Sequence, residues 1–211
     1  MTALLRRLLR CPRAASAAEF ALVLPLLLLF LFGVIDVGRF MWEVNQAEKA
    51  TQVGARMAIV TDPVSTGLVE ANFASSTIPA GSLIPANALG NLVCNSSACT
   101  CADCPTSIGG AVNSAAFTAI VNRMAQIKPG ITAANVEVTY RGSGFGYAGT
   151  AAAGPGGGSA PPEAMEISPL VTVALKDVVF EPLFMLFTVS ITLPSFTTTM
   201  TAEDSAGTFS N

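Results

Sequence analysis

One stretch near the N-terminus of the chain is apolar without interruption. Residues 20–35 carry no charge, and with the small residues at 14–18 they supply about the ~20 residues that a helix needs to cross a ~30 Å hydrocarbon core. Apolar or small side chains then recur every three or four positions, at Phe40, Val44, Ala47, Thr51, Gly54, Met57 and Ala58. This spacing predicts one helix of roughly 45 residues, with a transmembrane part over 14–38 and a continuation over 39–61. Asp62-Pro63 should end it, because a residue before proline avoids the helical region.

Shorter elements are expected in the remaining domain, residues 62–211. Helical spacing predicts a second helix between the capping candidates Asn113 and Ser114 and the stop signal Lys128-Pro129-Gly130, with its apolar side chains at Phe117, Ile120, Val121, Met124 and Ile127. Alternating side chains predict strands at 136–140 and 171–175, and a further strand running from 189 toward Met200. The fold class is therefore α+β, with one long helix, one short helix and about three antiparallel strands.

Two stretches of this domain are predicted to be loops, because they are rich in Ser, Thr, Asn, Pro and Gly. The first runs from Pro63 to about Gly110 and contains a Cys-rich loop at 94–104, and the second is a Gly/Pro-rich loop at 142–162. The segment from Val178 to Phe187 is apolar but too short to span a membrane. It is expected to form a buried crossover, helical around Leu183 to Phe187, or an exposed apolar contact surface.

The basic residues are concentrated at one end of the chain. Four of the eleven lie in a leader at residues 1–13, namely Arg6, Arg7, Arg10 and Arg13. The positive-inside bias therefore predicts a single-pass protein with its N-terminus in the cytoplasm and everything after about Asp36 outside it. A cleaved signal peptide is the alternative interpretation, but no small-residue cleavage site follows Ile35.

Composition narrows the function classes. Charged residues make up only 12% of the chain, against roughly 25% in soluble domains, which favours a membrane protein. The absence of histidine removes the usual general base, the Ser/His and Cys/His nucleophile pairs and the commonest metal ligand. Neither an enzyme, nor a cofactor, nor a metal site is expected. The net charge of −3 makes nucleic acid an unsuitable partner.

Four cysteines cluster within the first loop, at Cys94, Cys99, Cys101 and Cys104. In an oxidising compartment an even set such as this predicts two local disulfides, for which three pairings are possible. Cys101-Ala-Asp-Cys104 could instead be a redox pair or half of a metal site. Against both alternatives, no thioredoxin-like strand precedes the pair and no second metal-type pair accompanies it.

Three features of the apolar helix are not explained by apolarity alone. Glu19 places a carboxylate at the cytoplasmic end of the span, where it either meets a partner or reaches headgroup water. Pro25 removes one backbone hydrogen bond inside the span and predicts a kink or a looser turn. Gly33 and Gly38 offer small surface where another helix could approach closely.

The run Ala-Ala-Ser-Ala-Ala-Glu-Phe-Ala-Leu-Val-Leu-Pro-Leu-Leu-Leu-Leu, followed by Phe-Gly-Val-Ile-Asp-Val-Gly-Arg-Phe, resembles the start of TadE-like proteins. Gly54-Ala55-Arg56-Met57-Ala58 is similar to the continuation of that family. TadE-like proteins belong to the tight-adherence (Tad/Flp) pilus machinery of bacteria. The resemblance implies a pilin-like (pseudopilin) component of the inner membrane that acts in pilus assembly or a related secretion apparatus, with its C-terminal domain periplasmic or extracellular.

The same resemblance assigns roles to particular residues. A prepilin peptidase would cut between Ala14 and Ala15, which leaves Glu19 at the fifth mature position and Phe20 where Tyr often follows. Helix contacts with other pilin-like or Tad assembly proteins would involve Glu19, Phe20, Pro25, Gly33 and Gly38. The lipid bilayer is the remaining expected partner. The alternative function is a membrane-tethered extracytoplasmic binding or sensor module.

The predicted topology can be tested with a reporter that is active only outside the cytoplasm. Because the basic leader should stay inside, the reporter should be active when fused after Asn211 and inactive when fused before Met1. Reporter activity in whole cells, corrected for protein level, is the measurement, and the reverse pattern would contradict the predicted orientation.

Overall fold

The computed structural model describes residues 12–104, 108, 110–149, 165–184 and 190–202. Most of the predicted leader and the second half of the predicted Gly/Pro-rich loop lie outside these residues. The chain divides into two compact units, each described by itself below. The anchor unit comprises Met1–Glu43 with Phe180–Ile191, and the sheet unit comprises Val44–Val179 with Thr192–Asn211.

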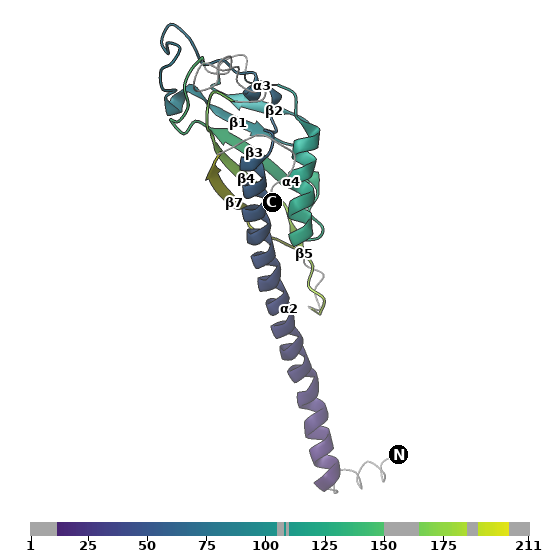
Figure 1. Ribbon diagram of the computed structural model, residues 1–211. Helices are drawn as coiled ribbons and strands as arrows, with labels where there is room; N and C mark the ends of the chain where they lie inside the picture. Colours follow the sequence, from purple (N-terminus) through teal and green to yellow (C-terminus); the bar gives the residue numbers. More distant parts are fainter. Residues whose placement is uncertain (1–11, 105–107, 109, 150–164, 185–189, 203–211) are drawn as a thin grey trace. The chain divides into compact units, whose positions relative to one another are not determined.

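The long helix predicted from the sequence is present as α2, Pro12–Val60 (Figure 1). Pro25 lies inside α2 without ending it. The part from Ser16 onward is long and apolar enough to cross a membrane. The C-terminus of α2 is closed by Thr61, whose N–H and Oγ1 both donate to the carbonyl of Met57, at 3.1 and 2.7 Å, just before Asp62-Pro63.

Five antiparallel strands form the main sheet of the sheet unit, in the order β2-β1-β3-β4-β7 (Figure 1). Their bounds are β1 Asn91–Cys94, β2 Cys99–Ala102, β3 Val136–Arg141, β4 Leu170–Leu175 and β7 Phe196–Thr201. A separate two-stranded sheet pairs β5 Val179–Phe180 with β6 Ile191–Thr192. The helical elements after α2 are α3 Thr66–Val69, α4 Ser114–Ile127 and the 3-10 turns Ala86–Ala88 and Ala133–Asn135.

The predicted α+β class, with a long helix followed by antiparallel strands, is confirmed. Strands β3 and β4 and helix α4 occur where the periodicity placed them, and Asn113 caps α4 by accepting a hydrogen bond from the N–H of Ala116. The single strand predicted from 189 toward Met200 is instead divided into β6 and β7, which belong to different sheets. The prediction of one irregular loop from Pro63 to Gly110 was wrong, because this stretch contains α3, β1 and β2. A strand of four residues is too short for its alternation of apolar and polar side chains to be detected in the sequence. Strand β1 forms because β3 pairs with it.

Small residues on the C-terminal part of α2 let it lie close to the sheet and to α4. A Cβ added to Gly54 would fall 2.7 Å from Sδ of Met124 in α4 and 3.4 Å from Cγ1 of Val173 in β4. Neighbouring positions on the same part of α2 are buried alanines, at Ala47, Ala50, Ala55 and Ala58. From Ala47 onward, the predicted stripe is therefore the face that the helix turns toward the core of the sheet unit.

A buried tyrosine connects β3 to the chain that follows α2. The ring of Tyr140 is only 1% exposed, and its hydroxyl oxygen accepts a hydrogen bond of 2.9 Å from the N–H of Val64. Burial raises the pKa of the Tyr140 phenol well above its ordinary value, while the hydrogen bond from Val64 acts in the opposite direction. Tyr140 therefore stays neutral and satisfies a backbone N–H that water does not reach.

Replacing Tyr140 with Phe should lower the free energy of unfolding by about 1–3 kcal/mol, because the N–H of Val64 loses its acceptor inside the core. Urea unfolding of the full-length protein in detergent, followed by near-ultraviolet circular dichroism, measures this change. Tyr147→Phe is the matched control, since Tyr147 is about half exposed and water can replace what its hydroxyl loses. Equal stability of Tyr140→Phe and the wild type would contradict a structural role for this hydrogen bond.

The same variant tests how much of the loss of stability at alkaline pH comes from Tyr140. An unfolded tyrosine ionises near pH 10, and burial holds the pKa of folded Tyr140 above that value. Between the two pKa values only the unfolded chain loses this proton, so the stability contributed by Tyr140 is complete below pH ~10 and is lost as the pH rises beyond it. Tyr140→Phe should reduce that alkaline loss, whereas Tyr147→Phe should leave it in place.

Candidate functional site

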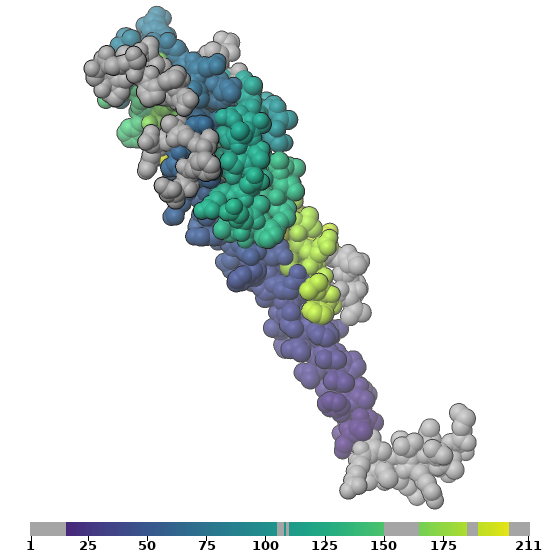
Figure 2. Space-filling model, turned by 45° about the vertical axis from the view of Figure 1, so that its right-hand side comes forward, coloured from purple at the N-terminus to yellow at the C-terminus, as the bar shows by residue number. Residues whose placement is uncertain are grey.

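The anchor unit exposes apolar side chains around most of its helix. Leu22, Leu26 and Phe30 are 80%, 71% and 70% exposed, and Figure 2 shows the purple N-terminal part of α2 with its side chains uncovered on the visible face. An apolar surface of this extent indicates contact with lipid or with another apolar protein surface. The contact surface of the anchor is therefore the first candidate for a functional site.

The five helix residues predicted to make assembly contacts do not lie on one stripe. At about 100° per residue, Glu19 and Gly33 lie within about 40° of each other around the axis, whereas Phe20 and Gly38 share a direction about 100° from Glu19. Pro25 projects on a third side. Glu19, Phe20 and Pro25 are exposed, and a Cβ added to either glycine would meet nothing within 4 Å. The glycines therefore serve no packing within the described chain and leave two faces open for a neighbour.

Asp36 is the exception on this exposed helix, because its side chain is only 2% exposed. Its two carboxylate oxygens accept hydrogen bonds from consecutive backbone N–H groups, Oδ1 from Leu183 at 3.0 Å and Oδ2 from Phe184 at 2.9 Å. Arg39, one turn later, lies 3.6 Å from Oδ1 of Asp36 and donates to the carbonyl of Glu181 at 3.4 Å. One acid and one base thus hold residues 181–184 against α2.

Aromatic contacts flank this polar pair on both sides. The ring of Phe32 stacks on that of Phe184, with centroids 4.6 Å apart. The ring of Phe40 meets that of Phe180 edge-on at 5.4 Å, and the guanidinium of Arg39 lies 5.4 Å from the centroid of the same Phe180 ring. We call the helix residues Phe32, Asp36, Arg39 and Phe40 with the segment 180–184 the Asp36 clasp. In Figure 2 the segment 180–184 belongs to the yellow-green atoms alongside α2.

The sequence interpretation missed the Asp36 clasp. It used Asp36 only as the charge that ends the apolar run, and it expected residues 183–187 to be helical. Leu183 and Phe184 instead form a bend, because their N–H groups donate to a side chain rather than to the preceding turn; residues 185–187 lie outside the described residues. The available signals were an acid and an arginine three positions apart at the end of the apolar run, and the apolar character of Val178 to Phe187.

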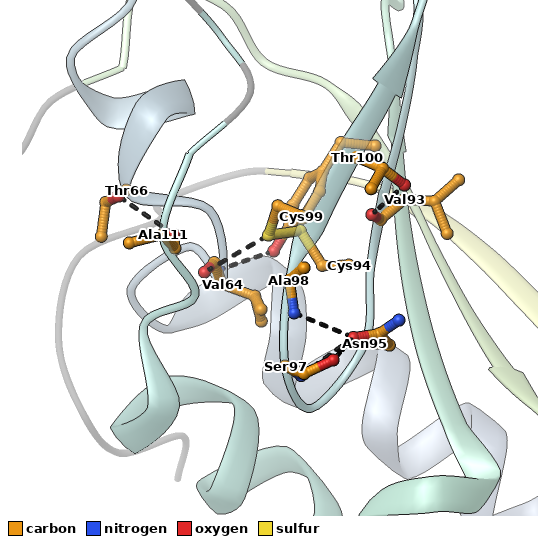
Figure 3. The surroundings of a disulfide bond; sticks show 11 residues. Val64, Thr66, Val93, Cys94, Asn95, Ser97, Ala98, Cys99, Thr100 and Ala111 are labelled. Carbon is orange, nitrogen blue, oxygen red and sulfur yellow. Dashed lines mark hydrogen bonds between the residues drawn. A yellow bond between two sulfur atoms is a disulfide. The ribbon is translucent and has the colours of Figure 1, made fainter.

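The four clustered cysteines form two disulfides, Cys94–Cys99 and Cys101–Cys104. Cys94 and Cys99 stand directly opposite each other at the end of the β1–β2 hairpin, with their Cα atoms 4.0 Å apart. The side chain of Asn95 shapes the turn by accepting hydrogen bonds from the N–H groups of Ser97 and Ala98, each at 2.9 Å (Figure 3). These bridges stabilise a short hairpin that has little apolar surface of its own.

No metal site accompanies these cysteines in the part of the chain that the structure describes. Among those residues, no group of three or more His, Cys, Asp or Glu side chains is arranged to hold a metal ion. The predicted processing residues Ala14 and Ala15 lie in the first turns of α2, where the structure describes the backbone alone.

The fold and the anchor together define an α+β protein with one N-terminal helix long and apolar enough to serve as a single-pass membrane anchor. Residues 14–56 match the family model described as TadE-like protein, which confirms the resemblance found in the sequence. The match spans 43 of the 211 residues. It covers the apolar run, Asp36 and Arg39 and ends before the sheet. No curated protein and no solved structure matches the chain.

Removal of the Asp36 carboxylate should free the segment that it holds. In Asp36→Ala the N–H groups of Leu183 and Phe184 lose a charged acceptor, whose hydrogen bonds are worth about 1.5–3 kcal/mol each. Hydrogen exchange at these two amides should therefore accelerate by about ten- to a hundredfold. Asp36→Asn, which keeps one carbonyl oxygen, should leave one of the two amides protected.

Amide exchange of the full-length protein in lipid nanodiscs, resolved at Leu183 and Phe184, gives the measurement. Glu48→Ala is the matched control, since it removes a carboxylate from an exposed position on the same helix. Unchanged exchange at both amides in Asp36→Ala would show that Asp36 does not hold the segment.

Proposed function

We propose that this protein is a pilin-like (pseudopilin) component of a Tad-type pilus or a related secretion apparatus, and that it acts by packing its anchor helix against other pilin-like helices. The match of residues 14–56 to the TadE-like family carries the proposal. It falls on the helix whose apolar side chains lack cover within the described chain, which is the surface that such packing requires.

The topology that we propose follows the charge distribution. The basic leader at 1–13 stays in the cytoplasm, residues 14–38 cross the inner membrane, and residues 39–61 with the domain at 62–211 lie in the periplasm or outside the cell. An oxidising compartment would support the two disulfides of the outer domain. That domain then presents protein surface to other assembly components, while the anchor supplies lateral contacts within the membrane.

The helix offers two kinds of lateral contact. Gly33 and Gly38 open two faces of α2 to close approach by a neighbouring helix. Glu19 is exposed at the opposite end of the apolar run, where a carboxylate would be costly next to lipid but stable next to a cation. We propose that its partner is the amine of Ala15 on a neighbouring chain, freed when a prepilin peptidase cuts between Ala14 and Ala15, or a basic group of the assembly platform.

Substitution of Glu19 tests this function directly. Glu19→Ala should leave membrane insertion intact, because it removes a charge from the end of the span. It should nevertheless reduce assembly strongly, because removal of one member of a buried pair can cost about 3–5 kcal/mol. Glu19→Gln should cause a smaller loss if hydrogen bonding matters more than charge.

The measurements are the level of the protein in the membrane and the yield of pili or secreted product, taken from the same cultures. Leu22→Ala is the control, since it truncates an exposed side chain one turn further along without changing charge. Unchanged output of Glu19→Ala at an unchanged membrane level would show that Glu19 is an end residue that only reaches headgroup water.

A further inference from the structure

Two apolar side chains of the segment 180–184 are exposed, although Asp36 and Arg39 hold its backbone. Leu183 is 65% exposed and Phe184 is 43% exposed. Neither residue is helical. Within the anchor unit these two side chains therefore extend the apolar surface of α2 beyond the helix itself, and they need a partner of their own.

The contacts of the clasp fix the level of this segment along the helix. The ring of Phe184 stacks on Phe32, which is three residues before Ile35, the last residue of the uncharged run. At 1.5 Å per residue, Phe32 lies about 4.5 Å inside the end of that run. If the run crosses the bilayer, the ring of Phe184 lies at the level of the acyl chains rather than in water.

A non-helical backbone is tolerated at that depth only where the protein satisfies its polar groups. The clasp meets this condition for three backbone groups of the segment. The N–H groups of Leu183 and Phe184 donate to Asp36, and the carbonyl of Glu181 accepts from Arg39. The Asp36 and Arg39 charges also lie close together, so the pair adds no net charge at the edge of the hydrocarbon.

We infer that the segment carrying Leu183 and Phe184 inserts into the outer edge of the bilayer beside α2, as a second membrane contact that Asp36 holds in place. The occupant of its exposed apolar surface is lipid acyl chain. This inference rests on the proposed membrane anchorage. Because both α2 and this segment would then enter the bilayer, rotation of the anchor helix about its own axis would be restricted. A fixed face of α2 would be left for neighbouring helices.

The test uses tryptophan fluorescence in vesicles of phosphatidylcholine that carries bromine, a quencher, on its acyl chains. The native chain has one tryptophan, so each variant carries Trp42→Phe and one new tryptophan. Leu183→Trp reports on the segment, and Leu26→Trp reports on the middle of the apolar run. Leu83→Trp is the matched control, because Leu83 is 59% exposed and belongs to the sheet unit.

Leu183→Trp should lose emission most strongly with bromines near the glycerol end of the chain, and Leu26→Trp with bromines near the methyl end. Leu83→Trp should lose little with either. Adding Asp36→Ala should restore the Leu183→Trp emission and shift it to the red, because the tryptophan enters water.

Three failures are distinguishable. Quenching of Leu26→Trp without quenching of Leu183→Trp would overturn the inference while leaving the anchor intact, and would leave protein as the partner of the apolar segment. An unquenched Leu26→Trp would overturn the membrane anchorage itself. Quenching of Leu183→Trp that persists in Asp36→Ala would overturn the role of Asp36 in holding the segment.

Discussion

The constraint on which this molecule depends is that backbone polar groups inside a bilayer must find partners within the protein. An α-helix meets it along residues 20–35, because every interior N–H bonds to a carbonyl one turn earlier. The constraint also explains why Pro25 is tolerated in α2, since a single missing donor can be accommodated where a run of missing donors cannot. The Asp36 clasp satisfies the same requirement with side chains, at a place where the backbone is not helical.

Helix α2 changes its surface along its length without changing its secondary structure. Along residues 20–35 most side chains are large and apolar, which suits lipid and neighbouring helices alike. In the sheet unit most of the buried positions are small, at Gly54 and four alanines, and a larger side chain at Gly54 would collide with Met124 and Val173. A helix that packs on a sheet needs such a narrow stripe of small residues, whereas a helix in lipid has no single inward face.

The elements that could be predicted are those with their own periodicity. The apolar run, the spacing of Phe117 to Ile127 and the alternation around Val138 and Val173 each specify an element from local sequence. Strands β1 and β2 could not be predicted, because four residues such as Asn91–Cys94 become a strand only through pairing with β3 and closure by a disulfide. The pairing of the cysteines depends in the same way on which residues the hairpin places opposite each other. The roles of Glu19, Ala14 and Ala15 remain predictions.

The Asp36 clasp was hidden for a different reason, since its two halves are separated by 147 residues of sequence. The helix half lies within the region that matches the TadE-like family, and the half at 180–184 lies outside it. An acid at the end of an apolar run is sufficiently explained as the residue that stops the span, so nothing local demands a second role. Its burial is what reveals one, because a carboxylate that merely ended the span would be solvated. Asp36 instead accepts hydrogen bonds from two backbone N–H groups. These hydrogen bonds allow non-helical backbone to lie at the inferred depth in the bilayer, where only helical backbone would otherwise be stable.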